Sequence, residues 1–156
     1  MEKELTKQNW NMISEVELVY KSKVKSSDRP QLKSVFDVAE FLKKNWDENK
    51  IELLEQFKVV FLNRNHRVLG IYEVSSGGVS GTVADAKLIF MAALKINACT
   101  LIISHNHPSG NLCPSEADKK LTQRIKEAAL LLDILLLDHI ILTNEGYYSF
   151  ANEGLL

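Results

Sequence analysis

Three side chains that can bind a metal ion lie within the short stretch from His105 to Asp118. His105 and His107 follow a short apolar run, and in an extended chain residues two apart project to the same side. Asp118 comes eleven residues after His107, in the first turn of a predicted helix. Two imidazoles and one carboxylate can bind a catalytic zinc ion and leave its fourth position to water. The spacing therefore predicts a metal site, and zinc suits these ligands best.

Each of these residues also has a structural interpretation when it is considered alone. A histidine at a strand end is often a hydrogen-bonded structural group. Ser115 followed by Asp118 fits a helix capping box, although Glu or Gln is preferred over Asp at that position. Taken together, the H-x-H pair, the glycine-containing loop and S-x-x-D are hard to explain by capping and packing alone. The Cys113 thiolate is a further candidate ligand, since cysteine binds zinc readily.

The elements that must position this stretch follow an α/β pattern, which predicts a mixed β-sheet flanked by helices. We expect a frayed arm over residues 1–13 and a loop over 75–81. The predicted strands are residues 14–23, 56–63, 68–74, 99–104, 134–143 and 147–150. The predicted helices are residues 34–46, a second helix that begins at Thr82 or Val83, and residues 115–132.

Composition bounds the class of protein. The chain has 156 residues, 46% of them hydrophobic and 25% charged, with a formal net charge of −1. These values are typical of one globular domain and exclude a disordered, collagen-like or disulfide-rich chain. The charge balance makes nucleic-acid binding an unlikely main role. The N-terminus is polar and no apolar run reaches the roughly 20 residues of a membrane span, so we expect a cytoplasmic protein without membrane association.

The pattern His105-x-His107-x7-Ser115-x-x-Asp118 resembles the JAMM motif of the JAB/MPN metalloprotease superfamily. The segments HNHPSG, PSEAD, LLDHIIL and YYSFANEGLL resemble its bacterial RadC branch, and the resemblance runs from about Phe57 to the C-terminus. It implies a cytidine-deaminase-like fold, one zinc ion held by the two histidines and Asp118, and Ser115 as a catalytic residue that stabilises the tetrahedral intermediate.

The resemblance also implies a domain division. Residues 1–30 are expected to form an N-terminal arm and first strand, and residues 31–156 the RadC-like JAB/MPN domain, as one globular unit. The helix-hairpin-helix region that precedes this domain in longer RadC proteins is expected to be missing. That expectation removes the main structural reason to predict DNA binding.

The family pattern also requires an upstream glutamate, and three residues are candidates. Glu55 stands immediately before the apolar run FKVVFL, which matches the position expected from the family, and is preferred. Glu73, near the end of the following strand, is the second choice. Glu52 points elsewhere if residues 47–54 are helical. Any of the three could instead be a solvated carboxylate at the end of an element.

The predicted activity is hydrolysis of an amide or isopeptide bond by a metal-bound water, with Glu55 as the general base. The substrate would be a peptide or isopeptide of unknown identity. The alternatives are a DNA-repair-associated RadC protein and a non-catalytic MPN scaffold, and a homo-oligomer is possible. Scaffold members typically lose the metal ligands, which are retained here.

Other polar residues near the predicted site have more than one interpretation. Asn106 and Ser109 could orient the histidines or satisfy the loop backbone. The pair Asp138–His139 interrupts an apolar strand, and we expect a structural hydrogen bond there because buried polar groups need partners.

Overall fold

A computed structural model of the protein describes residues 22–77 and 83–156. Its helices are α1 (Val35–Lys44), α2 (Ala86–Lys95) and α3 (Glu116–Leu131), with a short 3-10 turn at Ser26–Asp28. Its strands are β1 (Gln56–Leu62), β2 (Val68–Ser76), β3 (Thr100–Asn106), β4 (Leu135–Leu142) and β5 (Tyr147–Ser149). The strand predicted over residues 14–23 and most of the loop predicted over 75–81 lie outside the described residues.

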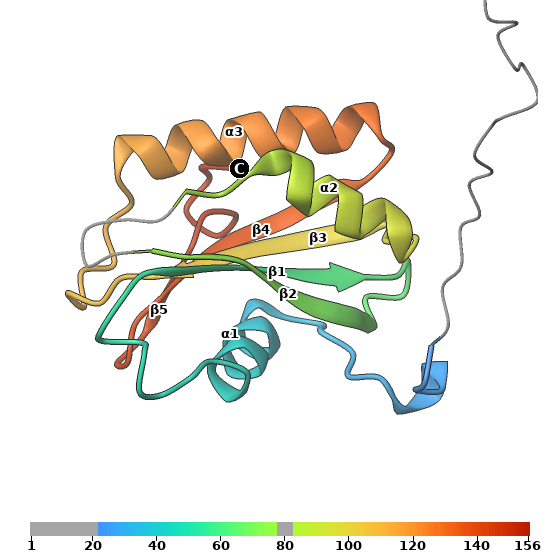
Figure 1. The fold of residues 1–156 in the computed structure, drawn as a ribbon, viewed down its shortest axis with the longest axis horizontal. Coiled ribbons are helices and arrows are strands. Elements are labelled where there is room, and N and C mark those ends of the chain that lie inside the picture. Colours follow the sequence, from blue (N-terminus) through green and yellow to red (C-terminus); the bar gives the residue numbers. More distant parts are fainter. Residues whose placement is uncertain (1–21, 78–82) are drawn as a thin grey trace, which may run out of the picture.

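The five strands form one mixed sheet in the order β2-β1-β3-β4-β5. Strands β3 and β4 are parallel and are connected through α3, whereas the other neighbouring pairs are antiparallel. Figure 1 shows α2 and α3 on one face of the sheet and α1 on the other. The predicted α/β architecture, a mixed sheet flanked by helices, is therefore confirmed.

Two apolar cores, one on each face, fix the central strands. Every residue of β1 and β3 is buried, as expected for strands covered on both sides. Val59, Leu101 and Ile103 belong to the core that α2 and α3 cover. Val60 and Ile102 belong to the core that α1 covers. Alternate residues along β3 thus face different helices, which decides where the polar residues at its end point.

Three predicted boundaries need correction. Strand β2 runs to Ser76, two residues into the predicted loop. Helix α2 begins at Ala86, three or four residues later than predicted, because Asp85 caps it by accepting a hydrogen bond from the backbone N–H of Lys87. Val83 continues the apolar pattern but is 84% exposed and lies outside the helix. Strand β3 extends beyond Ser104 to Asn106, so His105 is a strand residue and His107 follows the strand directly.

Among the described residues, no helix combines the length and the apolar character that crossing a membrane requires.

The covering of the sheet by α1 predicts unequal effects of two substitutions in that helix. Leu42 is fully buried against the sheet, whereas Phe36 is 62% exposed. Leu42→Ala should lower the free energy of unfolding by about 2–5 kcal/mol, because it leaves a cavity. Phe36→Ala should change it by less than about 0.5 kcal/mol. Urea unfolding of both variants measures this, and equal effects would contradict the packing of α1.

Candidate metal centre

The candidate site forms where the parallel strands β3 and β4 end. Open α/β sheets bind ligands at the carboxyl ends of their strands, because the chain leaves the sheet there in loops. The backbone N–H of His107 donates to the carbonyl of Leu142, which holds the first residue after β3 beside the end of β4. His105 alternates with Leu101 and Ile103 and so faces α3. His107 projects to the same side from the following loop.

Asp118 reaches this point from the first turn of α3. Ser115 is the N-cap, and its hydroxyl accepts a hydrogen bond from the backbone N–H of Asp118. The Asp118 carboxylate accepts in return from the backbone N–H and the hydroxyl of Ser115, each at 2.7 Å through Oδ2. The capping-box interpretation therefore holds alongside the ligand interpretation. The other carboxylate oxygen of Asp118, Oδ1, takes part in neither of these bonds and lies 3.3 Å from His105 Nε2.

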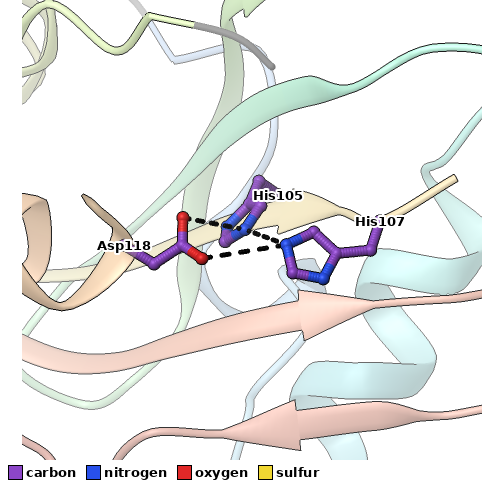
Figure 2. A group of neighbouring side chains, drawn as sticks. All are labelled: His105, His107 and Asp118. Carbon is purple, nitrogen blue, oxygen red and sulfur yellow. Dashed lines mark hydrogen bonds and ion pairs between the residues drawn. The ribbon is translucent and has the colours of Figure 1, made fainter. Parts of the chain in front are cut away.

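The three side chains converge on one point, as Figure 2 shows. The two Nε2 atoms of His105 and His107 are 3.0 Å apart, and Asp118 Oδ2 is 3.8 Å from His107 Nε2. In a tetrahedral site with metal–ligand bonds of about 2.0–2.1 Å, ligand atoms lie roughly 3.3 Å from one another. The 3.0 Å between the two nitrogens and the 3.3 Å between Asp118 Oδ1 and His105 Nε2 are close to that value. One ligand atom from each of the three side chains lies within 4.8 Å of the others, so this group could hold a metal ion.

The hydrogen bonds of the two rings explain why a cation belongs between them. His107 Nδ1 contacts the carbonyl of Asn111, which can only accept, so Nδ1 carries the proton and Nε2 of a neutral ring is a bare lone pair. His105 Nδ1 is bonded to His139. If both rings are neutral in this way, two lone pairs face each other across 3.0 Å. A proton on one ring or a metal ion must offset that repulsion.

The electrostatics of the centre favour a negatively charged Asp118. Partial burial alone would raise the pKa of Asp118. When His105 is protonated, its hydrogen bond and its charge, together with the bonds from Ser115, outweigh burial and hold that pKa well below its usual range. The carboxylate is therefore ionised at neutral pH, as a metal ligand must be.

A residue that the sequence did not assign to the site, His139, contacts it directly. His139 is fully buried on β4, and its Nε2 lies 2.8 Å from His105 Nδ1. Its Nδ1 lies 2.6 Å from the hydroxyl of Thr122 on α3. Burial and the neighbouring His105 lower the pKa of His139 well below its ordinary value. The hydrogen bond expected for Asp138–His139 therefore includes one to a candidate metal ligand.

Asn106, whose role the sequence left open, anchors the segment before β1. Its amide nitrogen donates to the carbonyls of Ile51 and Leu54, and its amide oxygen accepts from the backbone N–H of Gln56 at 2.7 Å. Asn106 is fully buried and satisfies loop backbone rather than orienting a histidine. Ser109 likewise contacts only loop backbone, at the N–H of Asn111.

Strand register places Glu55 on the face of the sheet that carries the histidines. Phe57 pairs with His105, so the antiparallel register continued by two residues sets Glu55 opposite His107. The carbonyl of Glu55 accepts from the N–H of Gly77 at 2.8 Å, which keeps its backbone on the sheet. Glu55 is partly exposed, so its carboxylate has access to water.

Glu73 lies on the opposite face of the sheet. It pairs in register with Lys58, and its carboxylate accepts from the side chain of Gln56 at 2.8 Å and lies 3.8 Å from the Lys58 ammonium. Gln56 and Lys58 alternate with Phe57 and so point away from His105. The geometry therefore favours Glu55 over Glu73 as the upstream glutamate.

The condition for setting Glu52 aside, a helix over residues 47–54, is not met. Residues 47–54 form turns rather than a helix, and Glu52 lines a pocket of about 250 Å³ that His107 also borders. Its carboxylate accepts a hydrogen bond from Asn144 at 3.3 Å. The turn after β4, including Glu145, forms another wall of this pocket. The pocket therefore lies beside a candidate metal ligand.

The two cysteines are both free. Cys113 is exposed and is not part of the group of side chains that can hold a metal ion. Cys99 is partly buried next to the start of β3.

The fold and the site together define an α/β domain with a His-His-carboxylate group at the ends of its parallel strands. Comparison with protein families gives the particular family: residues 32–155 match the RadC-like JAB domain. The chain therefore belongs to this family. The match begins before α1, whereas the resemblance in the sequence was recognised only from about Phe57 onward.

The chain is similar to several bacterial proteins named UPF0758 protein. One from Flavobacterium johnsoniae is 48% identical over 101 residues, which cover 65% of this chain and 44% of that protein. One from Porphyromonas gingivalis is 47% identical over 103 residues, covering 65% and 45%. YfjY from Escherichia coli is 39% identical over 102 residues, covering 65% and 64%. The matches thus span roughly half the length of the first two relatives.

The three hydrogen bonds of Asn106 predict a cost when they are removed. Asn106→Ala should lower the free energy of unfolding by at least about 2 kcal/mol, because it leaves buried backbone groups at residues 51–56 without partners. Hydrogen exchange at the Gln56 amide should also become faster. Ser109→Ala, a change in the exposed loop nearby, should stay within about 0.5 kcal/mol of the unmodified protein. Unchanged exchange at Gln56 in Asn106→Ala would contradict the anchoring role.

Proposed function

We propose that this protein is a zinc-dependent hydrolase of the JAMM type, which cleaves an amide or isopeptide bond. The observation that carries the proposal is the 3.0 Å approach of two imidazole Nε2 atoms, whose other ring nitrogens are both hydrogen-bonded, beside an ionised carboxylate. Membership of the RadC-like JAB domain family supports it, because the JAB/MPN superfamily includes metalloproteases.

His105, His107 and Asp118 would hold the zinc ion. When bound, zinc acts as a Lewis acid, which polarises a carbonyl and lowers the pKa of water from 15.7 towards about 7. Asp118 would use Oδ1, since Oδ2 is held by two hydrogen bonds from Ser115. The two hydrogen bonds from Ser115 therefore hold the Asp118 carboxylate in one orientation before zinc binds.

Glu55 would act as the general base. The β1–β3 register supports this role: Phe57 pairs with His105, and continuing the register by two residues would set Glu55 opposite His107, on the face where the scissile bond would lie. Glu55 would take a proton from the attacking water at its carboxylate and deliver it to the nitrogen of the leaving amine. Its partly exposed position allows this exchange of protons.

Ser115 would serve two roles in turn. Its hydroxyl donates to Asp118 Oδ2. Rotation of the hydroxyl hydrogen away from Oδ2 would let Ser115 donate to the oxyanion of the tetrahedral intermediate. The backbone N–H of Ser115 stays bonded to Asp118 Oδ2 during that rotation, so the ligand keeps its support.

The substrate would enter through the pocket that Glu52 and His107 line. An extended peptide or an isopeptide-linked side chain fits this open, polar depression. A non-catalytic scaffold would need none of the three clustered ligand side chains, and the net charge of −1 gives no support to a DNA-binding role. We therefore prefer the hydrolase to both alternatives.

Metal content tests the first half of the proposal. Purified protein supplied with zinc should hold about one zinc ion per chain, as expected for a single site with three protein ligands. His105→Ala and Asp118→Ala should each lose it, whereas His66→Ala, which changes a histidine outside the cluster, should keep it. Elemental analysis after gel filtration provides the measurement. Zinc-free protein after this treatment would exclude the hydrolase and leave the scaffold in first place.

Substitution of the glutamates tests the second half. In an amine-blocked peptide library digested with the zinc-loaded protein, mass spectrometry should detect new amines. Glu55→Gln should retain zinc but lower the cleavage rate by roughly 10²–10⁴-fold, because the general base is lost. Glu73→Gln, on the opposite face, should cleave normally. If Glu52→Gln abolishes cleavage while Glu55→Gln does not, the base has been assigned to the wrong glutamate.

A further inference from the structure

We propose that His139 and Thr122 are positioning residues that hold His105 in the tautomer whose Nε2 lone pair faces the metal centre. The inference deepens the proposed function and rests on it for its effect on zinc binding. His139 lies on β4 and Thr122 on α3, and neither belongs to the group that would hold the metal ion. Asp118, which does belong to that group, lies on α3 as well.

A continuous chain of hydrogen bonds links the metal centre to α3. From His105 Nδ1 it runs 2.8 Å to His139 Nε2, and from His139 Nδ1 it runs 2.6 Å to the hydroxyl of Thr122. The hydroxyl of Thr122 donates to the backbone carbonyl of Asp118 at 2.7 Å. Thr122, His139 and His105 are all buried, at 2%, 0% and 1% exposure, so water does not compete for these bonds.

The chain has one consistent direction. A carbonyl oxygen only accepts, so the single hydroxyl proton of Thr122 is used on Asp118. The Thr122 oxygen must then accept from His139, which places the His139 proton on Nδ1. A neutral ring that carries its proton on Nδ1 accepts at Nε2, the atom that lies 2.8 Å from His105 Nδ1. His105 therefore donates from Nδ1, and its own lone pair lies at Nε2.

The opposite direction would prevent metal binding. If Thr122 donated to His139 Nδ1, the proton of a neutral His139 would lie on Nε2 and would point at His105 Nδ1. His105 would then carry its proton on Nε2, the atom 3.0 Å from His107 Nε2 and 3.3 Å from Asp118 Oδ1. A ligand nitrogen must be deprotonated to bind a metal. The Asp118 carbonyl thus selects the direction that leaves the ligand atom free.

Stacked rings hold His139 at the angle that the chain requires. The Phe150 ring stacks on His139 with centroids 4.4 Å apart and planes 16° from parallel. The backbone N–H of Phe150 donates to the carbonyl of His139 at 3.0 Å. On the other side of the chain, Phe57 stacks on His105 with an interplanar angle of 7°. Stacking therefore restrains the rotation of the His139 and His105 rings, and the hydrogen bonds determine which nitrogen of each ring carries the proton.

The test uses two pairs of variants and two independent readouts. Thr122→Val removes the hydroxyl at constant volume, and Thr122→Ser restores it. His139→Phe keeps a stacking ring without an acceptor, and His139→Gln returns an acceptor near the position of Nε2. The first readout is the tautomer of His105 in zinc-free protein, from ¹⁵N NMR at a pH where the histidines are neutral. The second is zinc affinity, from competition with a chromophoric chelator.

We expect His105 to carry its proton on Nδ1 in the unmodified protein and in Thr122→Ser, and to populate both tautomers in Thr122→Val. Zinc affinity should fall roughly 10–100-fold in His139→Phe, as measured for supporting residues of metal ligands elsewhere, and less in Thr122→Val. His139→Gln should recover part of the loss. A merely structural role would leave the tautomer of folded Thr122→Val unchanged.

Two results would overturn the inference. One is a proton on Nε2 of His105 in the unmodified protein. The other is zinc affinity in both Thr122→Val and His139→Phe equal to that of the unmodified protein. Failure of the proposed function gives a different pattern: no zinc is bound by any variant, while the tautomer of His105 still responds to Thr122→Val and thereby supports the positioning role.

Discussion

The approach of two imidazole nitrogens to 3.0 Å is the constraint on which the rest of the site depends. Neutral rings repel at that distance when their lone pairs face each other, so the fold must supply the free energy to hold them there. It does so with a bond at the far nitrogen of each ring, from His139 and from the Asn111 carbonyl. A cation in the space between the two nitrogen lone pairs would offset their repulsion.

The sheet makes this convergence possible because β3 and β4 are parallel. Parallel neighbours end at the same edge, so the loop after β3 and the turn after β4 lie together. The loop after β3 leads into α3 at that edge, so the first turn of the helix presents Asp118 there, and α3 then carries the chain to the opposite edge, where β4 begins. The antiparallel strand β1 begins at the same edge, which is why the residue before it, Glu55, is available to the site. Strands β1, β3 and β4 and helix α3 therefore each place one end at this edge of the sheet.

The sequence predicted those parts of the site whose residues lie close together along the chain. His105, His107, Ser115 and Asp118 lie within one loop and its flanking elements, so their types and spacing were sufficient to group them. His139 could not be grouped with them, because its contact depends on the pairing of β3 with β4 in a particular register. A buried histidine in an apolar strand was the available signal, and it indicated only that a hydrogen-bond partner must exist.

The same reasoning explains the outcome for the fold. Apolar periodicity predicted the helices and strands of the described residues to within a few positions, because burial on one or two faces governs it. It placed the start of α2 too early, since Val83 continues the apolar pattern while the cap at Asp85 determines where the helix begins. Periodicity also could not choose among Glu52, Glu55 and Glu73. That choice requires knowing which face of the sheet each carboxylate occupies, and only strand register supplies it.

Ser115 and Asp118 show that a capping box and a metal ligand need not be competing interpretations. The box consumes one carboxylate oxygen of Asp118, and the other remains directed at His105. Asp in place of the usual Glu at this position shortens the side chain, and its second oxygen then stays close to the helix terminus. The positive end of the α3 dipole further favours the ionised carboxylate. Residues that start the helix therefore also favour the charge and hold the orientation of a candidate metal ligand.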